Sequence, residues 1–118
     1  MKKFKAIVLA AVAVVSLVGA AYAADTIALE VVISKPKAGV TMEQVQANDK
    51  AVDAFVRAQK GFVSREVGIS KDGQMFVIVH WASMADAEAA GAAFMKDPSG
   101  AAAMSTGDVV VYNHYVVQ

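Results

Sequence analysis

The sequence contains no cysteine among its 118 residues. This absence excludes disulfide frameworks, thiol nucleophiles, thiolate-bound zinc or iron–sulfur sites and haem attachment through a Cys-x-x-Cys-His motif. A chain of this length forms one small domain at most, so a multidomain enzyme is also excluded. The domain must be held together by ordinary burial of apolar side chains.

Positive charge is scarce beyond the first few residues. The chain has 11 basic and 11 acidic side chains, but Lys2, Lys3 and Lys5 lie in a segment without any acid. Residues 24–118 therefore carry a net charge of −3. Because basic side chains do not gather with aromatic ones, we expect no nucleic-acid partner. The sequence also lacks a phosphate-binding loop, a nucleotide fingerprint and a nucleophile elbow.

The N-terminal segment has the form of a secretory signal peptide. A basic start is followed by an apolar run over residues 6–20 and by an Ala-Tyr-Ala tripeptide that ends at residue 23. This pattern predicts a signal peptide over residues 1–23 and a folded domain over residues 24–118. The mature protein is then expected in the periplasm or outside the cell, without stable membrane association. The alternative is an uncleaved membrane anchor, because the uncharged run nearly reaches the length of a membrane span.

Hydrophobic periodicity predicts six elements in the order β-α-β-β-α-β. The strands are predicted at residues 26–35, 62–70, 74–81 and 108–118, and the helices at residues 41–60 and from residue 83 to before Pro98. Thr41 with Gln44, and Ser83, have the form of helix caps, and Gly73 lies in a hairpin turn. A short turn is predicted at residues 101–104. The order indicates an α+β, ferredoxin-like fold with a four-stranded antiparallel sheet.

In such a fold both helices cover the same face of the sheet, so the second face of a monomer should be polar. Residues 75–79 and 109–111 are instead apolar on both faces, and Glu30 is the one interruption in the first strand. Burial of about eight large side chains on the second face would contribute roughly 1.5 to 3 kcal/mol each, which would outweigh the cost of about 4 to 15 kcal/mol for bringing two molecules together. We therefore expect a homodimer joined sheet to sheet.

Residues 61–90 resemble the antibiotic-biosynthesis-monooxygenase-like members of the dimeric α/β barrel superfamily. The markers are Gly61-Phe62 at the start of the second strand, Trp81 at the end of the third, and Ser83 capping a helix that contains Ala87. The resemblance implies two monomers whose sheets close into a barrel, with a pocket between sheet and helices in each. Members include cofactor-independent monooxygenases that form quinones, haem-degrading enzymes and proteins of unknown activity. We expect no cofactor.

His80 and Trp81 are neighbours on a strand, so their side chains point to opposite faces of the sheet. His80 is the candidate general base, because a histidine titrates near neutral pH; the alternative is a hydrogen-bonded interior histidine. Trp81 could stack on a flat ligand or anchor the core. His114, on the last strand, is a further candidate ligand-binding residue and should lie about 10 Å from His80 across the sheet. We therefore expect no shared metal site.

Two polar residues have open interpretations. Asn48 falls on the apolar stripe of the first helix, where it either meets a substrate together with Asp49 or lies at the helix edge. Arg65 either points inward to bind an acidic ligand group or, as the edge position of its strand favours, extends to water.

The second helix is rich in alanine, which allows either close approach to the sheet or room for a guest molecule. A guest pocket would be lined by Phe55, Phe94, Met84 and Met95, which suits an apolar aromatic compound. These expectations together describe an exported domain that binds a small hydrophobic or aromatic molecule, with cofactor-independent oxidation of a phenolic or quinol-type compound as its candidate activity.

The alternatives are a non-catalytic periplasmic binding or stress-related protein, and a haem-binding protein. The haem-degrading members of the family rely on an asparagine in the first strand, a tryptophan ending the third and a histidine on the second helix. Trp81 is the one match in this sequence, so haem degradation is not expected.

Overall fold

A computed structural model of the chain describes residues 27–118, which form one antiparallel sheet and three helices. The elements along the chain are β2 (Ala28–Pro36), α1 (Met42–Arg57), β3 (Phe62–Ile69), β4 (Met75–Trp81), α2 (Met84–Phe94), α3 (Pro98–Thr106) and β5 (Gly107–Val116). The predicted signal peptide lies outside the described residues. Within residues 27–118, none of the helices has the length and hydropathy needed to cross a membrane.

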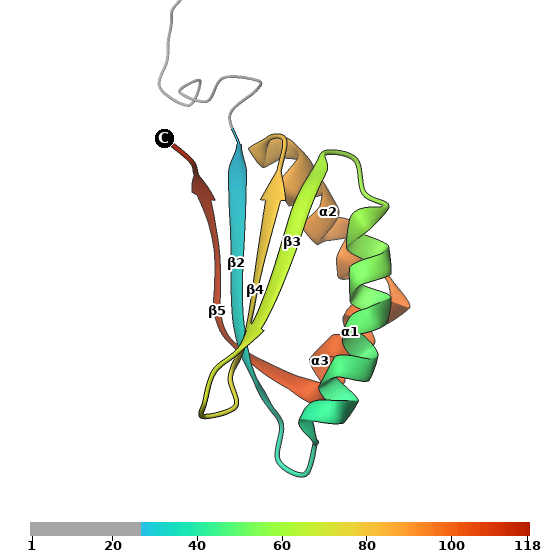
Figure 1. The fold of residues 1–118 in the computed structure, drawn as a ribbon. Helices are drawn as coiled ribbons and strands as arrows, with labels where there is room; N and C mark the ends of the chain where they lie inside the picture. The colour runs from blue at the N-terminus through green and yellow to red at the C-terminus, as the bar shows by residue number, and fades with distance from the viewer. Residues whose placement is uncertain (1–26) are drawn as a thin grey trace, which may run out of the picture.

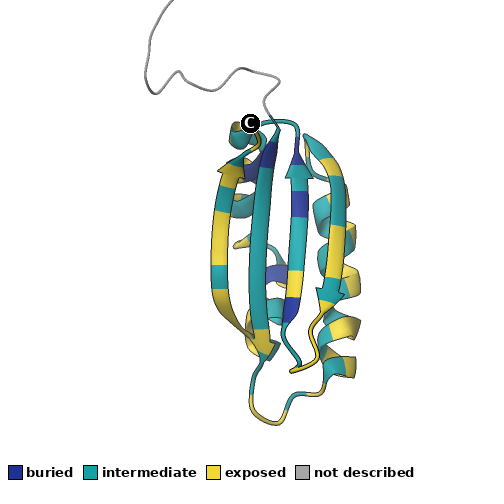
Figure 2. Ribbon diagram, turned by 60° about the vertical axis from the view of Figure 1, so that its left-hand side comes forward, coloured by how far each residue is buried: buried dark blue, intermediate teal, exposed yellow. Residues whose placement is uncertain are grey.

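The sheet has the strand order β3-β4-β2-β5, and every neighbouring pair is antiparallel. The first strand thus separates the third from the fourth, which confirms the predicted ferredoxin-like fold. Figure 1 shows α1, α2 and α3 on one side of the sheet. Figure 2 looks onto the sheet with the helices behind it: the central strands β2 and β4 are mostly intermediate or buried, and exposed residues are more frequent on the edge strands β3 and β5. We call these two sides the helix face and the open face.

The helix starts follow the predicted caps. The Thr41 hydroxyl accepts a hydrogen bond from the Gln44 backbone N–H, and the Gln44 side chain accepts one from the Thr41 backbone, which completes a capping box. Ser83 caps α2 by accepting from the Asp86 backbone N–H. Each cap satisfies backbone donors that the first helical turn leaves without partners.

The prediction of a short turn at residues 101–104 was wrong, because the structure has the helix α3 over Pro98–Thr106. Asp97 caps this helix by accepting from the Ser99 backbone N–H, and proline is well tolerated in the first turn of a helix. Gly100 lies against the carbonyl of Phe94, where any side chain would collide. The glycine thus lets α3 follow α2 closely and lie across the sheet.

The buried core is small and gathers where α2 crosses the sheet. Trp81 is 1% exposed, and it packs with Ala28 and Val79 of the sheet and with Ala87 and Ala90 of α2. The alanines of α2 therefore allow close approach at this end of the sheet. Farther along, the helices stand off from the strands, and a cavity opens.

Candidate functional site

A cavity of about 410 Å³ lies between the helix face of the sheet and the three helices. Its walls are mostly aliphatic and aromatic, with Val77 and Val79 from β4, Val52 and Val56 from α1, and Met104 from α3. The volume falls within the range of small-molecule pockets in proteins, and a mostly apolar lining is also typical of such pockets.

Five of the predicted ligand-binding residues line this cavity. They are Asn48, Phe55, Trp81, Phe94 and Met95. The rings of Phe55 and Phe94 lie 5.7 Å apart between centroids, so α1 and α2 meet through an aromatic pair at the cavity wall. Met84 packs against the core beside Trp81 and is not part of the cavity wall.

The indole of Trp81 forms part of the sheet-side wall of the cavity. Its Nε1 donates a hydrogen bond to Glu30 Oε1 over 3.0 Å, because β2 and β4 are neighbours and both side chains point to the helix face. The bond satisfies the buried indole N–H and fixes one oxygen of the carboxylate. Trp81 is thus both a core anchor and a wall of the cavity.

Tyr112 of β5 brings a phenol to the same part of the cavity. Partial burial, together with the negative charge of Glu30 and a hydrogen bond to its carboxylate, raises the pKa of Tyr112 to about 12. The hydroxyl lies beside Gly91 of α2, where an added Cβ would be 3.1 Å from the phenol oxygen. Tyr112 therefore stays protonated at neutral pH, and its hydroxyl donates toward the carboxylate of Glu30.

Asn48 points into the space between α1 and α3. Its side-chain amide nitrogen donates to the carbonyl of Ala102 over 3.3 Å and to the hydroxyl of Thr106 over 3.2 Å. Since a polar group on an apolar helix stripe needs a partner, these bonds account for the amide without a ligand. Asn48 ties α3 to α1 at the wall of the cavity.

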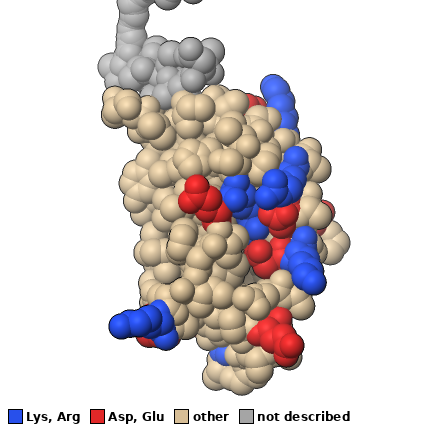
Figure 3. Space-filling view, viewed as in Figure 1, with Lys and Arg blue, Asp and Glu red and all other residues tan. Residues whose placement is uncertain are grey.

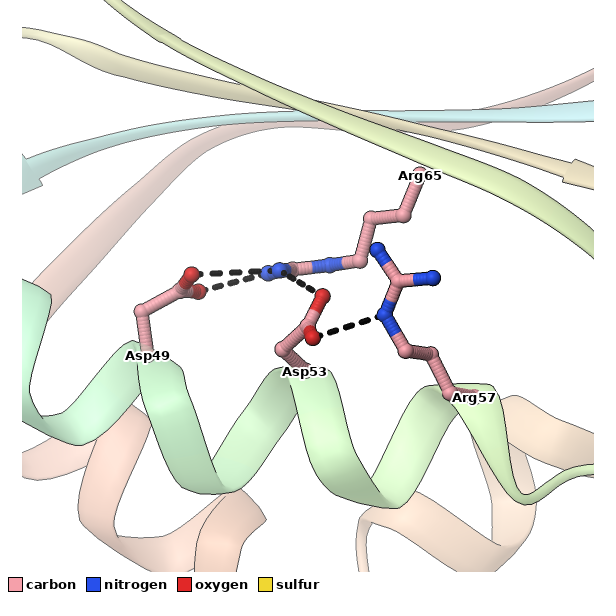
Figure 4. A network of polar contacts seen from close by, with 4 residues as sticks. All are labelled: Asp49, Asp53, Arg57 and Arg65. Carbon is pink, nitrogen blue, oxygen red and sulfur yellow. Dashed lines mark hydrogen bonds and ion pairs between the residues drawn. The ribbon is translucent and has the colours of Figure 1, made fainter.

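The expectation that Arg65 extends to water was wrong. Its side chain is 3% exposed and lies between β3 and α1, as Figure 4 shows. Both terminal nitrogens of the guanidinium bind Asp49, over 2.5 and 3.1 Å, and one also binds Asp53 over 3.0 Å. Although β3 is an edge strand, α1 covers its helix face, and the two carboxylates replace the water that the cation would otherwise seek.

Charge pairing in this cluster shifts two pKa values. The hydrogen bond from Arg57, 2.7 Å long, together with that from Arg65, holds the pKa of Asp53 below its usual value despite some burial. Burial opposes the charge of Arg65, but the hydrogen bonds and negative charges of Asp49 and Asp53 outweigh it and raise the pKa of Arg65. Asp53 and Arg65 are therefore ionised throughout the neutral range, and the cluster joins α1 to β3.

His80, the predicted general base, lies on the open face, so it does not line the cavity. Its Nδ1 is 3.1 Å from the hydroxyl of Ser64, its cross-strand neighbour on β3. The sheet separates this pair from Trp81 and Glu30. The catalytic role of His80 stays a prediction, and it would have to be played on the open face.

His114 lies on the helix face of β5, directly across from Glu30 of β2. Its ring meets that of Tyr112 edge to face at 5.3 Å, and it does not line the cavity. Its Nε2 is buried and has no hydrogen-bond partner among residues 27–118. Because His80 and His114 occupy opposite faces, they cannot share a metal ion. No cluster of metal-binding side chains occurs within the described part of the chain.

The open face is predominantly apolar. Along the central strands it presents Leu29, Val31 and Ile33 of β2 and Phe76 and Ile78 of β4. Phe76 remains 38% exposed. In Figure 3 the charged side chains gather toward α1 and β3, whereas the surface over β5 and β2 is almost free of charge. In residues 27–118 no segment covers this face.

No protein-family model matches the sequence, and no curated protein matches it. Solved structures do match the fold. SnoaB, a cofactor-independent oxygenase from Streptomyces nogalater, matches with a TM-score of 0.69 and 15% identity over 79% of this chain and 94% of its own. A candidate antibiotic biosynthesis monooxygenase from Chloroflexus aurantiacus gives a TM-score of 0.56 and 13% identity over 78% and 93% of the two chains.

A dimeric ferredoxin-like protein of unknown function from Thermobifida fusca matches with a TM-score of 0.60 and 14% identity, over 82% of this chain and 96% of its own. At such identities the likeness establishes the fold. The chain therefore has the ferredoxin-like fold of the antibiotic biosynthesis monooxygenases, as the sequence resemblance implied.

Proposed function

We propose that this protein binds a small hydrophobic or aromatic molecule in the cavity between the sheet and the helices. The observation that carries the proposal is the cavity of about 410 Å³, whose walls are mostly apolar. The paired rings of Phe55 and Phe94 at the cavity wall offer aromatic surfaces to a flat guest. Apolar walls with a few polar groups are typical of sites that bind such molecules.

The candidate reaction in this cavity is a cofactor-independent oxygenation of a phenolic or quinol-type compound. A phenol can take one oxygen atom of O₂ into its ring as the second quinone oxygen, while the other leaves as water with two hydrogens of the substrate. The protein's part would be to hold the ring and to accept a proton. The fold shared with SnoaB, an oxygenase of this cofactor-independent kind, supports the assignment.

We also propose that two copies pair through their open faces. The apolar side chains of β2 and β4 on this face would be shielded from water, and the matching Thermobifida fusca protein is itself dimeric. Pairing would enclose His80 and Ser64 between the two sheets, away from both ligand cavities. The N-terminal pattern supports export of the mature domain, which N-terminal sequencing of the protein from a periplasmic fraction would test.

Ligand binding is tested by calorimetric titration with 1-methoxynaphthalene, an uncharged bicyclic aromatic. Val52 lines the cavity, so Val52→Phe should fill part of it and weaken binding at least about tenfold. Val117 is 47% exposed and lies outside the cavity, so Val117→Phe makes the same chemical change and should leave the affinity unchanged. Absence of binding to the unmodified protein would contradict the proposal.

Catalysis is tested by oxygen uptake with a panel of phenols, because the proposed step consumes one O₂ for each quinone formed. Turnover that Val52→Phe reduces and Val117→Phe spares would place the reaction in the cavity. Binding without any oxygen uptake would instead favour the non-catalytic alternative. His80→Ala should leave turnover unchanged if the chemistry takes place on the helix face, and should abolish it if His80 is the base.

A further inference from the structure

Most polar groups at the cavity wall already have protein partners. Both oxygens of Asp49 accept hydrogen bonds from Arg65, and Arg65 uses its terminal nitrogens on Asp49 and Asp53. The amide nitrogen of Asn48 is bound to α3. These groups hold the cavity wall together, and the buried atom among them that has no hydrogen-bond partner within residues 27–118 is Arg65 Nε, a donor.

Glu30 differs from them. It lines the cavity from the central strand β2, and Trp81 Nε1 binds its Oε1. A carboxylate has about four acceptor positions on its two oxygens, so the indole of Trp81 and the hydroxyl of Tyr112 together leave about half of its capacity unused. The indole also restricts the rotation of the carboxylate, which prepares it to receive a donor in a defined position.

The surroundings of Glu30 are suited to a hydroxyl-bearing ligand. Its neighbours on the adjacent strands are Val79 of β4 and His114 of β5, and the Tyr112 phenol lies close enough for the charge of Glu30 to affect its ionisation. The negative charge of Glu30 attracts a hydrogen-bond donor and repels an anion.

We propose that Glu30 is the specificity-determining residue of the cavity: it accepts a hydrogen bond from the hydroxyl of a phenolic ligand and discriminates against aryl ethers and aryl carboxylates. This inference rests on the proposed binding of aromatic molecules in the cavity, and it names their class as neutral phenols or quinols. In a reaction, the same carboxylate is placed to accept the phenolic proton, a role that His80 cannot fill from the open face.

The experiment compares three probes that share one ring system: 1-naphthol, 1-methoxynaphthalene and 1-naphthoate. Titration calorimetry at pH 7 should show 1-naphthol binding about 10 to 100 times more tightly than its methyl ether, the gain expected from a hydrogen bond to a charged acceptor. The anion 1-naphthoate should bind more weakly than the ether.

The variant Glu30→Gln keeps the shape of the side chain and removes its charge. It should lower the naphthol-to-ether preference at least about fivefold and strengthen 1-naphthoate binding, while the affinity for the ether stays unchanged and shows that the cavity is intact. Glu66 is exposed and lies outside the cavity, so Glu66→Gln should leave all three affinities unchanged.

Equal affinities of the unmodified protein for 1-naphthol and its ether would overturn the role of Glu30 and leave aromatic binding standing. A preference that survives in Glu30→Gln would overturn it as well. If none of the three probes binds, the proposed function itself fails, and the role of Glu30 fails with it.

Discussion

The buried cation Arg65 offers a sharp test of how the site is held together. Its guanidinium joins β3 to α1 through Asp49 and Asp53, and its side chain is 3% exposed. We consider two changes: Asp49→Asn, which removes the charge that faces both terminal nitrogens, and Arg65→Met, which removes the cation. The first change leaves the buried guanidinium without its main partner, and the second leaves two partly exposed carboxylates without the cation between them.

The expected loss in the free energy of unfolding depends on how deeply the ion pairs of Arg65 are buried. Breaking a fully buried ion pair by removing one partner costs about 3 to 5 kcal/mol. The side chains of Asp49 and Asp53 are 20% and 34% exposed, so water offsets part of this cost. We expect Asp49→Asn to lower the free energy of unfolding by about 2 kcal/mol and Arg65→Met by about 3 kcal/mol. Asp53→Asn should cost about 1 kcal/mol, since Asp49 still holds the guanidinium.

The double variant Arg65→Met with Asp49→Leu replaces the pair by apolar side chains of similar volume. The double variant should recover most of the lost stability, so that its free energy of unfolding lies within about 1 kcal/mol of that of the unmodified protein. The assay is urea unfolding followed by circular dichroism at one fixed protein concentration, because association would add to stability. If the free energies of unfolding of Asp49→Asn and Arg65→Met both lay within about 0.5 kcal/mol of that of the unmodified protein, the reasoning would be refuted, since ordinary surface substitutions have effects of that size.

Three further predictions concern ionisation and association. Because the pKa of Asp53 is lowered in the folded protein, its ion pairs stabilise the fold above about pH 4, and this stabilisation is lost as the pH falls through the folded-state pKa. Asp53→Asn should therefore reduce the loss of stability at acid pH, measured by thermal unfolding at a series of pH values. The pKa of Tyr112 is raised to about 12, so the stability of the fold should decline from about pH 10 upward. Glu30→Gln should lower this pKa in an ultraviolet titration, and an unchanged titration would contradict the contact between Glu30 and Tyr112. On the open face, Ile78→Glu should convert the proposed dimer into a monomer in analytical ultracentrifugation, whereas Ala85→Glu, on the exposed side of α2, should leave it dimeric.

The sequence was informative about the fold because each boundary has a local cause. Thr41 and Ser83 satisfy backbone donors at helix starts, and Gly73 adopts the positive φ that its turn requires. Such signals act over a few residues and can be recognised without knowledge of the tertiary structure. The α3 helix was missed because its cap, Asp97 followed by Pro98, was interpreted as the end of the preceding helix rather than the start of a new one.

The site was harder to predict, since it depends on which helix covers which strand. Strand alternation placed His80 and Trp81 on opposite faces, but only the packing of α2 determines that Trp81 is the one that faces the helices. Arg65 was misinterpreted for the same reason, because the position of α1 over an edge strand is a tertiary feature. Glu30 was noticed only as an interruption of an apolar strand, although a single acid in such a strand is itself a sign of a polar contact inside the domain.

The most direct test of the central claim uses the methionines as probes of the cavity. Met75, Met95 and Met104 line it, whereas Met42 and Met84 do not. With ¹³C-methyl-labelled methionine, saturation with 1-naphthol should shift the NMR signals of the first three and leave the other two near their original positions. Unchanged signals throughout, or shifts that spare the three lining methyl groups, would contradict the account of an aromatic-binding cavity beneath the helices.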